Sequence, residues 1–494
     1  MATAPQVTGA QELSADGVPL GLAKALDEAP LSRFHMRAVL TTGIGFFTDA
    51  YDLFVIGAVL VILKSQWHLT PSQASLVGST ALLAAFVGAF VFGRIADVFG
   101  RKRIYGLEAA IMVVGAIASA FSPSIVWLIA FRFVLGVGIG GDYPVSAVLM
   151  SEYSPSASRG KLVGLVFTMQ AAGLIVGPLA GIALVGSGLD HAIVWRLLLG
   201  IGAIPAAAVI WFRRRMPESP RFQAGMKGDA AKAARQIGEY SAGAVQVDQE
   251  ASIIALPVRR LGVSKLFTDP RLLLTLIGTA GTWFVFDYAY YGNSISTPVI
   301  LKDLAPHASL ITTLSLTLAI FAVAALPGYL LATMTMDRIG HRRLQLLGFV
   351  VMGACFLAIG VVPGITAAIL PFLLVYGASY FFAEFGPNTT TFVMSAEVFP
   401  LSLRTTGHGL SAGFAKVGAF IGVFLFPVLT SSLGLRGTLT LTAGFAAVGA
   451  LLTLLLPEPA GRSLESLGDA GRPPESLGEE AGQPADGLRS VPAT

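Results

Sequence analysis

The sequence predicts an all-α integral membrane protein with twelve transmembrane helices arranged as two related six-helix halves. Of its 494 residues, 54% are hydrophobic and only 13% are charged, and the mean hydropathy is +0.72. Soluble domains carry about 25% charged residues, so this composition excludes a large soluble enzyme with an ordinary surface. Apolar runs of about 20 residues, each long enough to cross a hydrocarbon core of about 30 Å as a helix, recur along the chain. Short motifs also recur at a nearly constant offset, which indicates a duplicated unit.

Twelve apolar segments are expected to cross the membrane. They lie at 39–63, 75–95, 104–121, 125–150, 161–184, 194–212, 271–296, 309–335, 344–362, 366–394, 405–430 and 436–456. Residues 1–38 then form an N-terminal tail, 39–212 the first half, 213–270 a polar central loop and 271–456 the second half. Residues 457–494 are rich in Pro, Gly, Glu and Ser, a composition that predicts a disordered tail.

The loop charges predict the orientation. Basic residues cluster after the even-numbered spans, as at 101–103 and 213–215, whereas the opposite loops hold little more than Lys64, Arg196, Lys302 and Arg436. By the positive-inside rule, both termini are expected in the cytoplasm. We therefore expect a multi-pass protein of the plasma membrane, or of the inner membrane in a bacterium. Because the basic residues lie in short loops rather than on one groove-sized patch, no nucleic-acid partner is expected.

Four motif pairs carry the internal repeat. The run Gly-Arg-Ile-Ala-Asp-Val-Phe-Gly-Arg-Lys-Arg at 93–103 returns in part at 336–343, and Ser-Glu-Tyr-Ser-Pro at 151–155 is echoed by Ala-Glu-Val-Phe-Pro at 396–400. Pro217-Glu218 is echoed by Pro457-Glu458, and Arg196 by Arg436, so all offsets lie between 240 and 245 residues. Parallel halves joined by a central cytoplasmic loop resemble the architecture of major facilitator transporters.

The repeated loop motif predicts a charge latch at the cytoplasmic surface. Asp97 is expected to face basic residues and a helix N-terminus across the inner surface, in contacts that break as the halves rock. The simpler interpretation, that the arginines only satisfy the positive-inside rule, does not explain why Asp97 and Gly100 recur as Asp337 and Gly340. The residues expected in the latch are Asp97, Arg101, Asp337, Arg342, Glu152, Glu397, Arg159 and Arg404.

Two carboxylates in the first span suggest proton coupling. Asp49 and Asp52 are three residues apart and therefore share one helix face. Two buried carboxylates so close cannot both ionise cheaply, which suits a proton carrier. The alternative is that each pairs with a basic group and stays charged, and Arg132 in span four is the expected partner. A carboxylate that exchanged Arg132 for a proton would satisfy both interpretations.

Other polar side chains inside the spans are candidates for a substrate site, because such groups are costly in lipid and usually functional. Asp142 and Tyr143 end a glycine-rich stretch of span four, and Gln170 lies in span five. The glycines do not form a nucleotide-binding loop, since no strand precedes them and no Lys-Ser/Thr follows.

Span seven places Trp283, Asp287 and Tyr291 four residues apart, and therefore on one stripe of a helix. Such a stripe is usually packing, but an unpaired carboxylate within it would be expensive. Asn388 follows a glycine and a proline that can break span ten at mid-membrane. Lys416 in span eleven requires a carboxylate or an anionic substrate as its partner.

The motifs resemble the phosphate:H⁺ symporter family of major facilitators over roughly residues 34–460. The resemblance lies in Gly-Gly-Asp-Tyr-Pro-Val-Ser at 140–146, Thr-Asp-Ala-Tyr-Asp at 48–52 and the stretch from Asn388 to Lys416; Pro-Glu-Ser-Pro-Arg at 217–221 is shared with sugar porters. By this resemblance, the phosphate-site positions are Tyr143, Gln170, Trp283, Asp287, Tyr291 and Asn388. The resemblance likewise assigns the proton path to Asp49, Asp52, Asp142 and Asp287, with Lys416 nearby.

The expected function is import of inorganic phosphate with protons by alternating access. Tyr, Trp, Gln and Asn can donate several hydrogen bonds to a tetrahedral dihydrogen phosphate, but a sugar requires similar donors. A sugar:H⁺ symporter therefore remains an alternative, as does a membrane receptor that senses phosphate. A channel would not need a duplicated architecture or buried titratable groups. No enzymatic nucleophile and base, no metal-ligand cluster and no cofactor are expected; the expected partners are phosphate, protons and the lipid bilayer, and a monomer would suffice.

Overall fold

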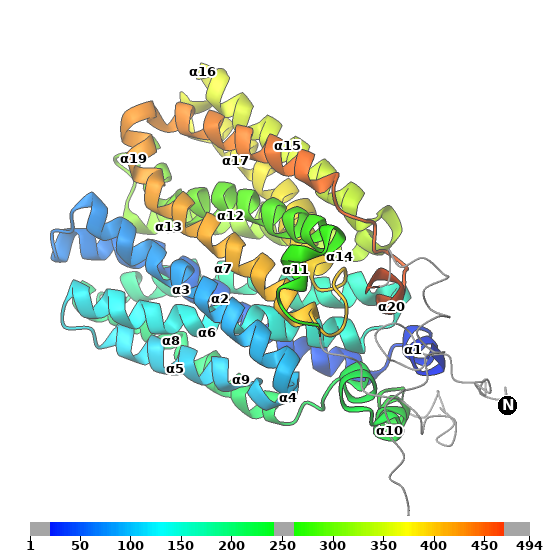
Figure 1. The fold of residues 1–494 in the computed structure, drawn as a ribbon. Coiled ribbons are helices and arrows are strands. Elements are labelled where there is room, and N and C mark those ends of the chain that lie inside the picture. Colours follow the sequence, from blue (N-terminus) through cyan, green and yellow to red (C-terminus); the bar gives the residue numbers. More distant parts are fainter. Residues whose placement is uncertain (1–19, 242–260, 469–494) are drawn as a thin grey trace, which may run out of the picture.

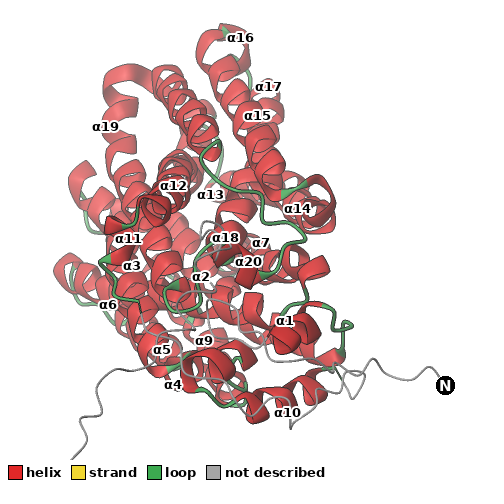
Figure 2. Ribbon diagram, turned by 45° about the vertical axis from the view of Figure 1, so that its right-hand side comes forward, coloured by secondary structure: helices red, strands yellow, loops and turns green. Residues whose placement is uncertain are grey.

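The computed structural model describes residues 20–241 and 261–468, and in these residues all regular structure is helical (Figure 2). Eleven of these helical segments are long and apolar enough to cross a membrane. The eleventh, α19 (Arg404–Thr453), has 50 residues. A helix of that length spans about 75 Å, more than twice a hydrocarbon core, and it bends sharply at Gly434, whose φ of +69° is not helical. The two arms of α19 are the eleventh and twelfth spans, so the predicted twelve-helix fold is confirmed.

The helices of the two halves lie side by side (Figure 1). The N-terminal half consists of α2 (Arg33–Gln66), α3 (Pro71–Phe99), α4 (Arg101–Ile104), α5 (Leu107–Ala120), α6 (Ile125–Tyr153), the 3-10 turn η1 (Ser156–Ser158), α7 (Arg159–Gly186), α8 (His191–Ile201) and α9 (Ala203–Arg214). The C-terminal half consists of α12 (Pro270–Leu304), α13 (Leu310–Ile320), the π-helix η3 (Phe321–Ala325), α14 (Leu326–Ile339), α15 (His341–Val361), α16 (Pro363–Thr366), α17 (Ile369–Ala383), the π-helix η4 (Glu384–Asn388), α18 (Thr389–Ser395) and α19.

Local sequence signals fix where the helices begin and end. Ser32 caps α2, which therefore starts six residues before the predicted span, and Thr70 with Gln73 forms a capping box at α3. Gly100 and Gly340 end α3 and α14 with φ of +100° and +98°. A side chain would be strained in that conformation, which explains why glycine stands at this point of both repeats.

The repeated motifs occupy equivalent places in the two halves. Glu218 accepts hydrogen bonds from the backbone N–H groups of Arg101 and Lys102, and Glu458 accepts them from His341 and Arg342. At the opposite end, Arg196 donates to Ala120 O and Ser122 O, while Arg436 donates to Gly360 O and Val361 O. The same residue types make the same contacts about 240 positions apart, as expected for a duplicated unit.

Short helices gather at one end of the bundle, which we call the α10 end (Figures 1 and 2). They are α1 (Leu20–Asp27), the π-helix η2 (Phe222–Met226), α10 (Ala230–Tyr240), α11 (Lys265–Thr268) and α20 (Leu464–Gly468). Leu22, Leu26, Phe222 and Ile237 share a small apolar core there. The expected central loop therefore carries helices of its own. The prediction that the chain is disordered from residue 457 is wrong up to residue 468, because α20 buries Leu464 and Glu465; residues 469–494 lie outside the described part.

Large apolar side chains remain exposed along the spans, among them Val114, Val323, Met334 and Leu374. Such a surface is unusual for a soluble protein but is the surface that a helical bundle presents to lipid. The chain is a multi-pass membrane protein.

Candidate functional site

An ion pair lies between the two spans that face each other in the C-terminal half. The ammonium group of Lys416 on α19 donates to Asp287 Oδ2 at 2.8 Å and to the hydroxyl of Tyr291 at 3.1 Å, both on α12. The same ammonium lies 4.6 Å from the ring centroid of Tyr143 on α6 and 4.4 Å from that of Tyr291. The pair thus touches both halves of the protein, and its charge is surrounded by aromatic rings.

A chain of amide and hydroxyl groups extends from this pair across the interface between the halves. Gln170 on α7 donates to the hydroxyl of Tyr143 at 3.0 Å and accepts from Tyr329 on α14 at 3.3 Å. Asn388 donates to the Tyr329 hydroxyl at 2.7 Å. Gln170 and Asn388 therefore approach the same tyrosine from opposite halves, and Tyr329 is a site residue that the sequence analysis did not identify.

Trp283 lies at one side of this series of hydrogen-bonded side chains. Its ring centroid lies 6.1 Å from Tyr143, 6.2 Å from Phe392 and 5.6 Å from His408. The six residues assigned to the substrate site by resemblance are all at most 3% exposed: Tyr143, Gln170, Trp283, Asp287, Tyr291 and Asn388. The structure brings them together at the centre of the bundle, in a state closed to both ends.

A helix break sets the position of Asn388. It ends the π-helix η4, in which Gly386 leaves helical geometry at φ −118° and ψ −107° and Pro387 carries no N–H donor. Close packing accompanies the break, because Gly348 on α15 lies against Gly386 and Pro387 with no space for a side chain. The expected interruption of span ten by glycine and proline is confirmed.

The two carboxylates of the first span lie in different surroundings, with Asp49 near Lys416 and Asp52 against Gly202. Asp49 is fully buried, and neither of its carboxylate oxygens accepts a hydrogen bond or forms an ion pair from any described residue. Arg132, the expected partner, donates instead to the backbone oxygen of Asp52 at 3.2 Å. No described residue forms a hydrogen bond or close ion pair with the Asp52 carboxylate. Arg132 therefore approaches Asp52, as expected, but its Nη1 atom binds the main chain of Asp52, and the expected side-chain ion pair is not formed.

Asp142 belongs to a separate buried cluster. Arg213 binds Asp142 Oδ2 and Glu108 Oε1, each at 2.7 Å, and Ser146 donates to Asp142 Oδ1. Arg213 had been expected in the central loop, but it is fully buried near the end of α9 and its guanidinium lies over the ring of Tyr105. Asp142 is therefore ion-paired in this closed state, whereas Asp49 is not.

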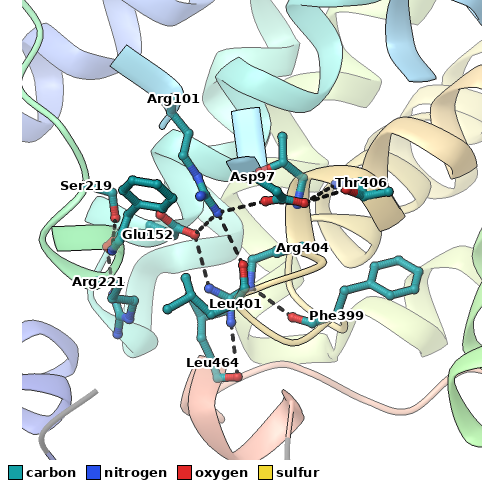
Figure 3. A network of polar contacts seen from close by, with 12 residues as sticks. Asp97, Arg101, Glu152, Ser219, Arg221, Phe399, Leu401, Arg404, Thr406 and Leu464 are labelled. Atoms are coloured by element: carbon teal, nitrogen blue, oxygen red, sulfur yellow. Dashed lines mark hydrogen bonds and ion pairs between the residues drawn. The ribbon is translucent and has the colours of Figure 1, made fainter. Parts of the chain in front are cut away.

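At the α10 end, four predicted latch residues meet across the two halves (Figure 3). Asp97 accepts hydrogen bonds from the backbone N–H groups of Thr405 and Thr406 at 3.2 and 2.7 Å and from the Thr406 hydroxyl at 2.7 Å. These donors form the N-terminal turn of α19, whose free N–H groups favour an anion. Arg101 pairs with Asp97 at 3.2 Å and with Glu152 at 3.0 Å, and Arg404 reaches Glu152 at 3.3 Å.

The second copy of the motif makes the equivalent contact, with the roles of the two halves exchanged. Asp337 on α14 accepts from the backbone N–H of Lys161, in the first turn of α7, at 2.8 Å. His341 then lies between Asp337 and Glu397, at 3.4 and 3.3 Å. The prediction of Arg342 at this point is wrong: the equivalent of Arg101, four residues after the aspartate, is His341. Arg342 is turned away and donates to Leu454 O at 2.9 Å.

A further group of charged residues extends the latch to α1 and α20. Asp27 binds Arg159 at 2.7 Å and Arg221 at 2.8 Å, and Arg221 also binds Glu465 at 2.8 Å. Arg159 also donates to the backbone oxygen of Arg462 at 2.8 Å, so segments from both ends of the chain hold it. Burial alone would raise the pKa of Glu465, but the guanidinium groups of Arg221 and Arg404 hold that pKa below its usual value. The sequence signals for this group are Arg159, an expected latch residue, and the motif at 217–221.

The described residues contain no cluster of His, Cys, Asp and Glu that could hold a metal ion. Each copy of the latch motif binds the helix N-terminus of the other half, and the central polar residues come from both halves. If the two halves move relative to each other as rigid bodies, the contacts of both latch copies break and re-form together.

Comparison with known proteins agrees with this architecture. The family described as "Sugar (and other) transporter" matches residues 38–470. The chain is 35% identical to "Probable inorganic phosphate transporter 1-6" of Arabidopsis thaliana, over 90% of this chain and 95% of the relative. It is 37% identical to "Putative inorganic phosphate transporter 1-13" of Oryza sativa subsp. japonica, over 90% and 92%.

A solved structure of the proton:xylose symporter XylE, bound to 6-bromo-6-deoxy-D-glucose, shares the fold with a TM-score of 0.75 and 19% identity, covering 89% of this chain and 100% of that one. The family match, the relatives and the fold agree. The chain therefore belongs to the sugar (and other) transporter family of the major facilitator superfamily, among the inorganic phosphate transporters.

Proposed function

We propose that the chain is a secondary active transporter that imports inorganic phosphate together with protons by alternating access. The observation that carries the proposal is the Lys416–Asp287 pair, enclosed by the hydroxyl and amide groups of both halves. A bound anion can replace Asp287 as the ion-pair partner of the Lys416 ammonium. A protonated Asp287 can then donate a hydrogen bond to the anion. The relatives named as inorganic phosphate transporters support phosphate as that anion.

Radiolabelled uptake into liposomes with an imposed pH gradient tests this function. Phosphate is expected to accumulate when the outside is more acidic, while sulfate and glucose are not. Binding of phosphate without uptake would instead indicate a receptor. We place the protein in the plasma membrane with the α10 end and both termini in the cytoplasm, since Lys102, Arg103, Lys161, Arg214 and Arg343 lie at that end. One chain contains the whole proposed site, so a monomer is sufficient for transport. The proposed function includes no catalytic step.

A sugar:H⁺ symporter of the same fold is the second candidate, favoured by the family description and by the fold of the xylose symporter. A neutral sugar gives the buried Lys416 no countercharge if Asp287 becomes protonated. An anionic substrate does, and for this reason we prefer phosphate.

The amide groups of Gln170 and Asn388 are expected to contribute to phosphate recognition. Gln170→Ala removes the amide group that donates to Tyr143 and accepts from Tyr329, and Asn388→Ala removes a donor to Tyr329. Losing a hydrogen bond to a charged group costs about 1.5–3 kcal/mol, so each variant should weaken phosphate binding roughly ten- to a hundredfold. Equilibrium binding of radiolabelled phosphate measures the effect, with Gln66→Ala at the end of α2 as control. Arsenate should compete with phosphate in the wild type, and competition by glucose would favour the sugar transporter instead.

Asp52 is expected to act in proton coupling. Its carboxylate is buried and forms no direct ion pair with any described residue, although Arg132 lies near enough to donate to the Asp52 backbone oxygen. It can therefore take up a proton without breaking an ion pair. Asp52→Asn should abolish accumulation driven by a pH gradient and leave phosphate counterflow partly intact. Parallel uptake and counterflow assays on one preparation separate the two activities, and normal accumulation would remove Asp52 from the proton path.

A further inference from the structure

Glu384 is a buried carboxylate in the C-terminal half to which the proposed mechanism gives no role. It begins the π-helix η4 and has no exposed surface. No lysine, arginine or histidine among the described residues forms an ion pair with it. Burying an ionised carboxylate without such a partner costs several kcal/mol, and polar groups inside a membrane protein are usually functional. Single-turn π-helices are also frequent at functional sites.

The titratable groups that surround Glu384 are one carboxyl group and three tyrosine hydroxyls. Tyr290 and Asp287 interact with it from α12, Tyr329 from α14 and Tyr380 from α17. The backbone of Gly328 on α14 packs against its Cβ atom. The basic group of the central site, Lys416, is already paired with Asp287. An ionised Glu384 would therefore add an uncompensated negative charge to a site that has to accept an anion.

Glu384 is nevertheless connected to the substrate residues by continuous hydrogen bonds. Its Oε2 accepts from Asn388 Nδ2 at 2.5 Å, and the same amide group donates to the Tyr329 hydroxyl at 2.7 Å. Tyr329 in turn donates to Gln170, which donates to Tyr143 beside Lys416. The protonation state of Glu384 is thus linked to the orientation of the Asn388 amide, a proposed phosphate ligand.

We propose that Glu384 carries a second coupled proton, in addition to the one that Asp287 carries. It takes up this proton from the outside before the site closes around phosphate and remains a neutral acid while the anion is bound. When the site opens to the cytoplasm and water reaches the carboxyl group, the proton leaves to that water. The ionised carboxylate then repels the anion and favours its release. The inference rests on phosphate:proton symport and adds one proton to each cycle.

The test compares the wild type with Glu384→Gln, which keeps the size of the side chain and is permanently neutral. Purified protein is reconstituted into liposomes, and phosphate uptake and internal acidification are measured on the same sample. The variant is expected to carry one proton fewer per phosphate. With a pH difference of one unit and no membrane potential, the loss of one proton lowers the maximal accumulation of phosphate tenfold.

Asp303→Asn is the matched control, because Asp303 is an exposed carboxylate at the C-terminal end of α12. Glu384→Asp, which retains the carboxyl group, should keep the wild-type ratio. An unchanged ratio in Glu384→Gln overturns the inference. If that variant does not assemble, Glu384→Asn is measured in its place, with the same expected loss of one proton per phosphate. A wild type that carries only one proton per phosphate also overturns the proposal. Absence of any phosphate transport by the wild type would instead refute the proposed function.

Discussion

Asp287→Asn is expected to bind phosphate and to fail to accumulate it. In the closed structure the Asp287 carboxylate holds the Lys416 ammonium at 2.8 Å. Asparagine mimics the protonated aspartate: it can donate a hydrogen bond to the anion but cannot take up or release a proton. Phosphate binding should therefore persist with a weakened pH dependence, while uptake against a gradient is lost.

The size of the effect follows from the charge that must be moved. Dihydrogen phosphate that enters alone against about 100 mV, inside negative, costs about 2.3 kcal/mol for its charge. One proton cancels this charge, and a second makes inward transport electrogenic. If Asp287 cannot carry its proton, the cycle loses this compensation, and the empty carrier also lacks the carboxylate that neutralises Lys416 during its return.

The rival explanation is a permanent structural pair. Removing one partner of a buried ion pair costs about 3–5 kcal/mol, so Asp287→Asn would misfold, and a second change, Lys416→Met, would rescue folding. Size-exclusion profiles, equilibrium phosphate binding and uptake, measured for the single and double variants, separate the two explanations. A well-folded Asp287→Asn protein with full accumulation would contradict both.

Most of the fold could be predicted from the sequence because its determinants are local or repeated. A hydrocarbon core selects apolar runs of one length, and a duplicated gene keeps its motifs in register. The ends of helices were less predictable. Ser32 extends α2 beyond its apolar run, and a single glycine, Gly434, bends two spans that stay joined as one helix. Neither feature changes the hydropathy of the chain.

The residue types of the site could be predicted from the sequence, but their ion-pair partners could not. Arg213 stands in a run of three arginines typical of a loop, but Glu108 and Asp142 on two other helices hold it in the core. At the second latch the register selects His341 over the neighbouring Arg342, although arginine is the more obvious residue for an ion pair. The isolation of Glu384 from basic groups likewise depends on tertiary packing.

Asp97→Asn is expected to open the α10 end of the protein. The Asp97 carboxylate accepts three hydrogen bonds from the first turn of α19 and pairs with Arg101. Asparagine has one acceptor oxygen, and its amide group would face the N–H donors. Losing a hydrogen bond between a charged group and its partner costs about 1.5–3 kcal/mol, so the ratio of open to closed molecules should rise roughly ten- to a hundredfold.

Spin labels on Lys102→Cys and Arg271→Cys can report the opening, since both positions are exposed at the α10 end and lie in different halves. Cys355, the single native cysteine, is replaced by serine in this background. Double electron–electron resonance should show a larger fraction of long distances in Asp97→Asn, with Asp303→Asn unchanged. The mirrored variant Asp337→Asn should have a smaller effect, because Asp337 accepts one backbone hydrogen bond instead of two and faces histidine instead of arginine. If these charges only orient the protein in the membrane, the distance distributions of all three variants will match that of the parent protein.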